Sequence, residues 1–178
     1  METRIVSGRM ASATSCTATS SVYLFDACAD LEEVILPASV KKIGAYVFRD
    51  CISLENVVMD GVELIGKQAF MNTGLKNLAL PGTMKQFGDE AFRNCANLQT
   101  IAINSNVTSY GKYVFAECPL LAEVTIGGGA TKLGDYMFYG CAALKTATLP
   151  GTVTYLGRYT FQGSGLTEID LSALTQLT

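Results

Sequence analysis

"LEEVILPASVKKIGAYVFRDC", residues 31–51, is one unit of a pattern that recurs along the chain. A large apolar residue and then a glycine stand five and four positions before the phenylalanine of this unit and of each later one. A leucine follows the phenylalanine by five or six positions, and two more apolar residues follow that leucine by three and five. The phenylalanine returns every 22 or 23 residues, at Phe25, Phe48, Phe70, Phe92, Phe115, Phe138 and Phe161. This regularity predicts a repeat architecture.

The physics of one unit indicates how the copies fold. The last two apolar residues of "LxxVxL" are two apart, so they share one face of a strand and their neighbours face outward. In three of the units a proline is predicted to end this strand, because proline lacks the N–H that a β-ladder needs; these are Pro37, Pro81 and Pro150. The following "VKKIG" is predicted to be a second, short extended piece whose glycine permits a sharp or positive-φ bend. "AYVFRDC" predicts a single helical turn, and units this small bury their apolar residues only by stacking.

The unit resembles the BspA-like leucine-rich repeats, also called the Treponema pallidum type, which read roughly L-x-x-I-x-L-P-x-x-V-x-x-I-G-x-x-A-F-x-x-C. The resemblance covers about residues 22–171. It implies a leucine-rich-repeat solenoid: a right-handed, β-rich coil of 22–23-residue repeats with a parallel sheet and short helical turns. It also implies a surface-exposed or secreted adhesion protein that binds other proteins and does not catalyse a reaction.

The repeats divide the chain into an irregular N-terminal segment or cap, residues 1–21, and a repeat array, residues 22–178. The array breaks off within its last repeat, before the next phenylalanine. Because a solenoid needs a cap at each end, we expect this array to continue into a longer one or its last coil to be covered by another chain.

Composition excludes several classes of function. The chain has 178 residues, of which 49% are hydrophobic and 16% charged, so it is long and apolar enough to fold around a core. Its net charge of −3 provides no basic face for nucleic acid. Since no apolar run approaches the ~20 residues of a transmembrane helix, we expect no membrane insertion. The first 16 residues show no signal peptide, so a cell-surface or secreted location rests on the resemblance alone.

Five cysteines occupy one repeat position, three residues after the phenylalanine, where they could hold a metal, form disulfides or fill the core. Zinc thiolates usually lie closer together in sequence, and the chain has no histidine. Parallel side chains in register point the same way rather than at each other, which disfavours disulfides. Thr73 and Ser164 take the same position in two turns that are one residue shorter. We therefore predict buried, reduced thiols, and different behaviour for Cys16; the five are Cys28, Cys51, Cys95, Cys118 and Cys141.

Motifs that could carry catalysis have structural explanations. "GGGATK", residues 127–132, lacks the spacing and the helix of a phosphate-binding loop. The paired carboxylates at Glu32 and Glu33, and at Glu168 and Asp170, have no apolar pocket to raise the pKa of one member. Without histidine there is no Ser-His-Asp triad. The sequence therefore predicts no enzyme, no cofactor and no metal site.

Tyrosine recurs two residues before the repeat phenylalanine, at Tyr23, Tyr46, Tyr113, Tyr136 and Tyr159. Gln68 and Glu90 fill the same position in the two units between, so the position is expected to be at least half exposed. A row of exposed rings could contact a glycan or a protein. Stacking between coils explains the row equally well.

The outward strand positions give the candidate binding site, for a protein or a glycan. One outward column is apolar for four coils and then polar for three, and solenoids use such faces for partners. We hypothesise that a partner docks on this apolar stretch and bonds to polar residues of the neighbouring column. The site is Ile35, Val58, Ala79 and Ala102, with Asn56, Asn77 and Thr100. β-branched residues also simply favour strands, and a spacer in a longer protein is the alternative function.

Overall fold

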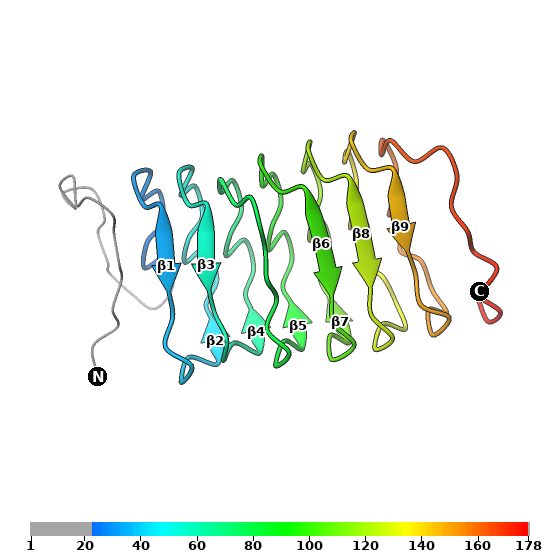
Figure 1. The fold of residues 1–178 in the computed structure, drawn as a ribbon, viewed down its shortest axis with the longest axis horizontal. Helices are drawn as coiled ribbons and strands as arrows, with labels where there is room; N and C mark the ends of the chain where they lie inside the picture. Colours follow the sequence, from blue (N-terminus) through cyan, green and yellow to red (C-terminus); the bar gives the residue numbers. More distant parts are fainter. Residues whose placement is uncertain (1–22, 178) are drawn as a thin grey trace.

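The computed structural model describes residues 23–177, which form a row of stacked coils (Figure 1). One face carries β1 (Glu33–Ile35), β3 (Asn56–Val58), β6 (Thr100–Ile103), β8 (Glu123–Ile126) and β9 (Thr146–Thr148). A second row of shorter strands comprises β2 (Lys42–Ile43), β4 (Leu64–Ile65), β5 (Gln86–Phe87) and β7 (Ser109–Tyr110). All strand pairs are parallel, and together they confirm the predicted parallel-sheet solenoid.

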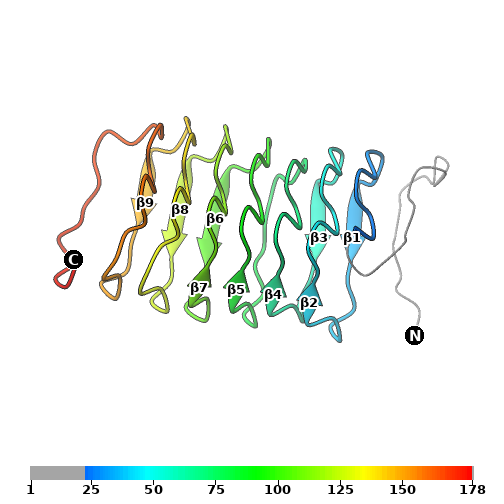
Figure 2. The same cartoon turned by 180° about the vertical axis from the view of Figure 1, so that it is seen from behind.

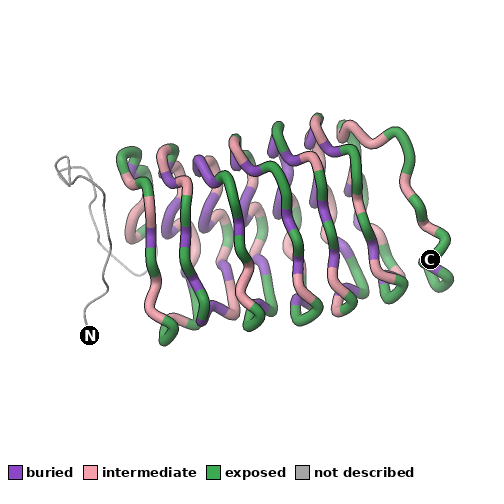
Figure 3. Tube along the Cα trace, in the orientation of Figure 1, coloured by how far each residue is buried: buried purple, intermediate pink, exposed green. Residues whose placement is uncertain are grey.

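The register keeps equivalent repeat positions side by side. Val34 pairs with Val57, and Ile101 pairs with Val124, so the inward apolar residues form columns. Exposed and buried residues alternate along the strands, as Figure 3 shows. The seven repeat phenylalanines form a continuous stack whose neighbouring ring centroids lie 5.2–5.8 Å apart. The core is therefore a set of parallel side-chain ladders running along the whole row.

The strand face is interrupted, which the repeat pattern does not predict. β1–β3 and β6–β8–β9 are separate ladders, because residues 76–80 between them form no strand. Residues 168–171 form no strand either. Both segments follow the turns that are one residue shorter, "FMNTGL" and "FQGSGL". In both repeats the interruption therefore coincides with the shorter turn.

The expected helical turn is wrong: no helix occurs within residues 23–177. In the segment around Phe48, Tyr46 has a φ of 63° and Asp50 a φ of 60°, both in the left-handed region. The N–H of Tyr46 bonds to the carbonyl of Lys67 at 2.9 Å, and the N–H of Phe48 bonds to that of Ala69 at 2.8 Å. Because the next coil accepts from these donors, the segment closes only isolated turns of its own, from Arg49 to Tyr46 and from Cys51 to Phe48, rather than a helix.

The repeat glycines have a different role from the one expected. Gly66 does not have a positive φ; the left-handed residue stands two positions later, at Gln68. A Cβ on Gly66 would lie 2.7 Å from the carbonyl carbon of Gly44 in the preceding coil. Glycine is therefore required because the backbones of neighbouring coils approach closely at this position.

The cysteine ladder is confirmed at four positions and wrong at one. Cys51, Cys95, Cys118 and Cys141 are free and buried. Each thiol donates to the carbonyl of the repeat phenylalanine one coil earlier, at 3.0–3.3 Å. Cys28 is disulfide-bonded, contrary to the prediction. It belongs to the first repeat, so the sequence contains no earlier repeat phenylalanine to supply that carbonyl. Cys16 and the predicted cap, residues 1–21, lie outside the described residues.

Candidate binding surfaces

The strand face carries all seven residues of the sequence-predicted site, and all seven are exposed. Ile35 and Val58, the two largest, keep 37% and 39% of their surface exposed. They lie side by side in the register of β1 and β3, and Asn56 lies beside Glu33. The structure therefore brings the first half of the predicted site together as one apolar pair with a polar neighbouring column.

The second half of the predicted site is less regular. Ala102 and Thr100 lie on β6, beside Thr125 and Glu123 of β8. Ala79 and Asn77 lie on residues 76–80, where the ladder is interrupted. The predicted apolar column is therefore divided in two. Ile35 and Val58 lie in one β-ladder and Ala102 lies in another, with Ala79 between them outside any strand. A partner would meet small side chains and a strand-free segment at the centre of this face.

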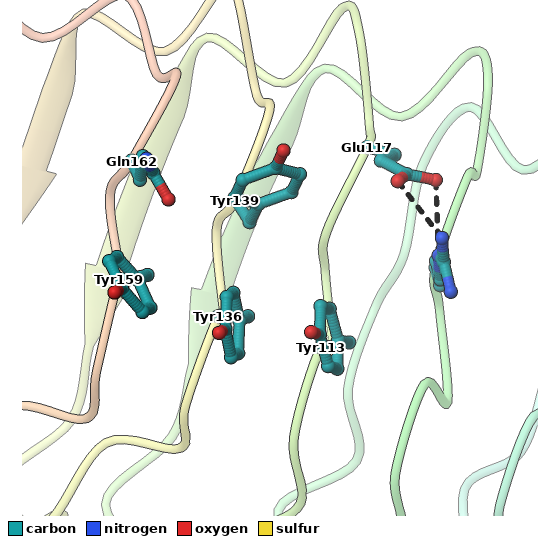
Figure 4. A pocket seen from close by; sticks show the side chains of 7 residues that line it. Tyr113, Glu117, Tyr136, Tyr139, Tyr159 and Gln162 are labelled. Atoms are coloured by element: carbon teal, nitrogen blue, oxygen red, sulfur yellow. Dashed lines mark hydrogen bonds and ion pairs between the residues drawn. The ribbon is translucent and has the colours of Figure 1, made fainter.

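The tyrosine row is a second surface. Figure 4 shows Tyr113, Tyr136 and Tyr159 on turns that run in front of the translucent strands, and Figure 2 shows the coils from behind. Tyr113 and Tyr136 stack with ring centroids 4.4 Å apart, and Tyr136 and Tyr159 with centroids 5.1 Å apart. Tyr23 and Tyr46 form a separate stack at 4.7 Å. Each of these five tyrosines has a φ between 56° and 68°. The stacking expected between coils is thus present. The expected half exposure holds for Tyr159 alone, at 55%: Tyr23 is 42% exposed, and the other three tyrosines are more deeply buried.

Arg93 covers the first ring of the longer stack. Its guanidinium carbon lies 5.5 Å from the ring centroid of Tyr113. It donates two hydrogen bonds to Glu117, at 2.9 and 3.0 Å, and one to Glu90 at 3.0 Å. The hydrogen bonds that Arg93 donates to Glu117 and, to a lesser extent, to Glu90 raise the pKa of Arg93. Sequence reasoning missed this cluster, although arginine follows the repeat phenylalanine both here and at Arg49, which pairs with Asp26 at 2.7 Å.

A hollow of about 420 Å³ lies along this row (Figure 4). Tyr113, Tyr136 and Tyr159 form one side, and Glu117, Tyr139 and Gln162 lie along the other. The ring of Tyr139 is turned by 73° from that of Tyr136, with centroids 5.9 Å apart. Every residue that lines the hollow carries a hydrogen-bonding group.

The remaining chemistry of the described residues is limited. No cluster of three or more histidine, cysteine, aspartate or glutamate side chains within residues 23–177 is arranged to hold a metal ion. In the same part of the chain, no helix is long and apolar enough to cross a bilayer. Burial raises the pKa of Cys51 and of Cys141 to about 12, so neither is a thiolate nucleophile at neutral pH.

Comparison with known proteins agrees with this architecture. A family model for the BspA-type leucine-rich repeat region matches residues 18–129 and 63–178, in six copies. The chain belongs to the BspA-type leucine-rich repeat family. The solved leucine-rich repeat protein of T. pallidum is 30% identical, with a TM-score of 0.77 over 80% of this chain and 67% of that one. Leucine-rich repeat proteins of this kind are generally protein-binding or structural.

Two further solved leucine-rich repeat proteins are longer chains. A leucine-rich repeat protein of Bacteroides ovatus is 26% identical, with a TM-score of 0.63 over 83% of this chain and 45% of that one. One from Eubacterium ventriosum is 21% identical, with a TM-score of 0.58 over 80% and 48% of the two chains, and shows the shared fold alone. The present chain therefore spans about half the length of these two. No curated protein matches it.

Proposed function

We propose that this chain is a non-catalytic protein-binding module that displays its strand face to a partner as part of a surface-exposed or secreted adhesion protein. The observation that carries the proposal is the exposed apolar pair Ile35 and Val58, which lie side by side beside the polar column of Asn56. Water-facing apolar side chains aligned over neighbouring coils are typical of contact surfaces. Membership of a repeat family that is generally protein-binding or structural supports it.

A purely structural spacer is the competing function. A spacer needs the core ladders but places no demand on which residues face outward. The outward column here changes from Ile35 and Val58 at one end to Thr125 and Thr148 at the other, while the inward positions stay apolar. This directional change favours a surface with a specific contact region.

The test is capture of cell-surface and matrix proteins on the immobilised chain, quantified by mass spectrometry. Val58→Glu with Ala79→Glu should reduce capture of the specific partner at least about tenfold, because two carboxylates would be buried against it. Thr125→Glu with Thr148→Glu adds the same charge to the same column and is the matched control. Equal capture by wild type and both folded variants would exclude the strand face, and no specific capture at all would favour the spacer.

A further inference from the structure

We propose that the hollow along the tyrosine row binds a short neutral oligosaccharide. This inference is independent of protein binding at the strand face, since Figure 4 shows the tyrosines that line the hollow on turns in front of the translucent strands. The volume of about 420 Å³ falls within the ~300–1,000 Å³ of small-molecule sites.

The side chains that line the hollow match a polyol. The phenols of Tyr113, Tyr136 and Tyr159 repeat along one side at the spacing of the coils, and each hydroxyl can both donate and accept. Gln162 adds an amide that donates and accepts, and Glu117 adds a carboxylate that accepts. Sugar hydroxyl groups need such alternating donors and acceptors at short intervals.

Tyr139 supplies the apolar contact that sugars also require. Its ring stands at 73° to that of Tyr136, so it does not continue the stack, and Figure 4 shows its face turned toward the viewer. The C–H face of a pyranose packs on an aromatic face of this kind. The stacked rings of Tyr113 and Tyr136, 4.4 Å apart, cover each other's facing sides and leave their edges and hydroxyls for hydrogen bonding.

The charges at the hollow select a neutral ligand. Arg93 is the only cation that lines it, and three of its N–H groups already bond to Glu117 and Glu90. One cation against two carboxylates leaves the cluster with net negative charge. Sialylated or sulfated sugars would therefore be repelled rather than held.

A peptide fits this surface less well. Extended peptides usually bind by adding a strand to an open backbone edge. Here the N–H of Tyr113 bonds to the carbonyl of Asp135 at 2.9 Å, and the N–H of Tyr136 bonds to that of Arg158 at 2.8 Å. The row therefore offers a ligand side-chain groups rather than free backbone donors, which suits a glycan.

The experiment is a glycan array with neutral, sialylated and sulfated oligosaccharides, followed by titration of a retained neutral trisaccharide with saturation-transfer NMR. We expect a dissociation constant on the order of 1 mM for a hollow this open. Tyr139→Ala should weaken binding at least about tenfold, and Tyr136→Phe several-fold through loss of one hydroxyl. Tyr46→Phe is the matched control, since Tyr46 takes the same repeat position in the separate stack, and should bind like wild type.

Circular dichroism of each variant establishes that it is folded before binding is measured. Val58→Glu with Ala79→Glu should keep the sugar affinity, which separates this site from the strand face. The proposal is overturned if no neutral sugar binds, if only anionic sugars bind, or if Tyr139→Ala and Tyr136→Phe bind like wild type. Loss of a captured protein, rather than a sugar, in Tyr139→Ala would also overturn it in favour of a peptide ligand.

Discussion

Removing one phenylalanine side chain from the stack measures how much packing between neighbouring coils contributes to the free energy of unfolding. Phe92 is fully buried and stacks on Phe70 and on Phe115, in both cases with centroids 5.3 Å apart. It also meets Phe87 edge-on at 5.8 Å. Phe92→Ala therefore removes the side chain from a site enclosed on both sides, which costs about 3–5 kcal/mol. This is a large part of the ~5–15 kcal/mol that stabilises an ordinary domain.

The control is the same substitution at Phe161, the last phenylalanine of the stack. Phe161 is only half-buried, and Phe138 at 5.5 Å is its one ring partner among the described residues. Phe161→Ala should cost about 1–2 kcal/mol, because less buried surface is lost. Urea denaturation followed by circular dichroism and tyrosine fluorescence measures both, since the chain has no tryptophan. If Phe92→Ala cost no more than Phe161→Ala, the stacked ladder would not be the source of coil-to-coil stability.

Three further experiments test the packing of the coils. Gly66→Ala should lower the free energy of unfolding by at least about 3 kcal/mol, because the Gly44 backbone lies 2.7 Å from the new Cβ. Gly82→Ala, whose Cβ would have no atom within 4 Å, should change the free energy of unfolding by less than about 1 kcal/mol. Equal denaturation midpoints for the two variants would contradict this. Burial raises the pKa of Cys51 and of Cys141 from 9.0 to about 12, so above about pH 9 only the unfolded state releases these protons. Thermal melts should therefore show stability falling from pH 9 toward 12, with a smaller fall in Cys51→Ala; an equal fall would count against the buried thiol. The four free ladder cysteines should react with a thiol reagent only in denaturant, and rapid native labelling would exclude their burial.

The repeat pattern predicts the stacking axis, the inward ladders and the exposed columns. This succeeds because each unit can bury its apolar residues only against its copies, so one period determines the whole core. The repeat leucines of five successive coils, for example, are fully buried as the pattern requires: Leu54, Leu75, Leu98, Leu121 and Leu144. The seven strand-face residues are also exposed where the alternation places them.

Backbone details were harder to predict because they depend on the neighbouring coil. The segment around Phe48 has the length of a helical turn, yet its N–H groups bond to the next coil and Tyr46 becomes left-handed. The gap at residues 76–80 comes after a turn that is one residue shorter, which a side-chain pattern shows only as a shift in spacing.

The second candidate surface was predicted only in part. The tyrosine positions were evident from the sequence, but their grouping with Arg93, Glu117 and Tyr139 depends on side-chain directions across three coils. Arg93 lies one coil before Tyr113, and Tyr139 one coil after it, so no local motif joins them. The Cys28 disulfide was missed because the ladder pattern treats every repeat as having a preceding copy.

Hydroxyl-radical footprinting of the partner complex tests the strand-face proposal most directly. Ile35 and Val58 are exposed at 37% and 39% in the chain alone, so both are oxidised there and report coverage. Tyr159, exposed at 55%, belongs to the tyrosine row and is the internal control. We predict that oxidation of Ile35 and Val58 falls several-fold in the complex while oxidation of Tyr159 stays unchanged. Protection of Tyr159 with unchanged oxidation of Ile35 and Val58 would contradict the proposal.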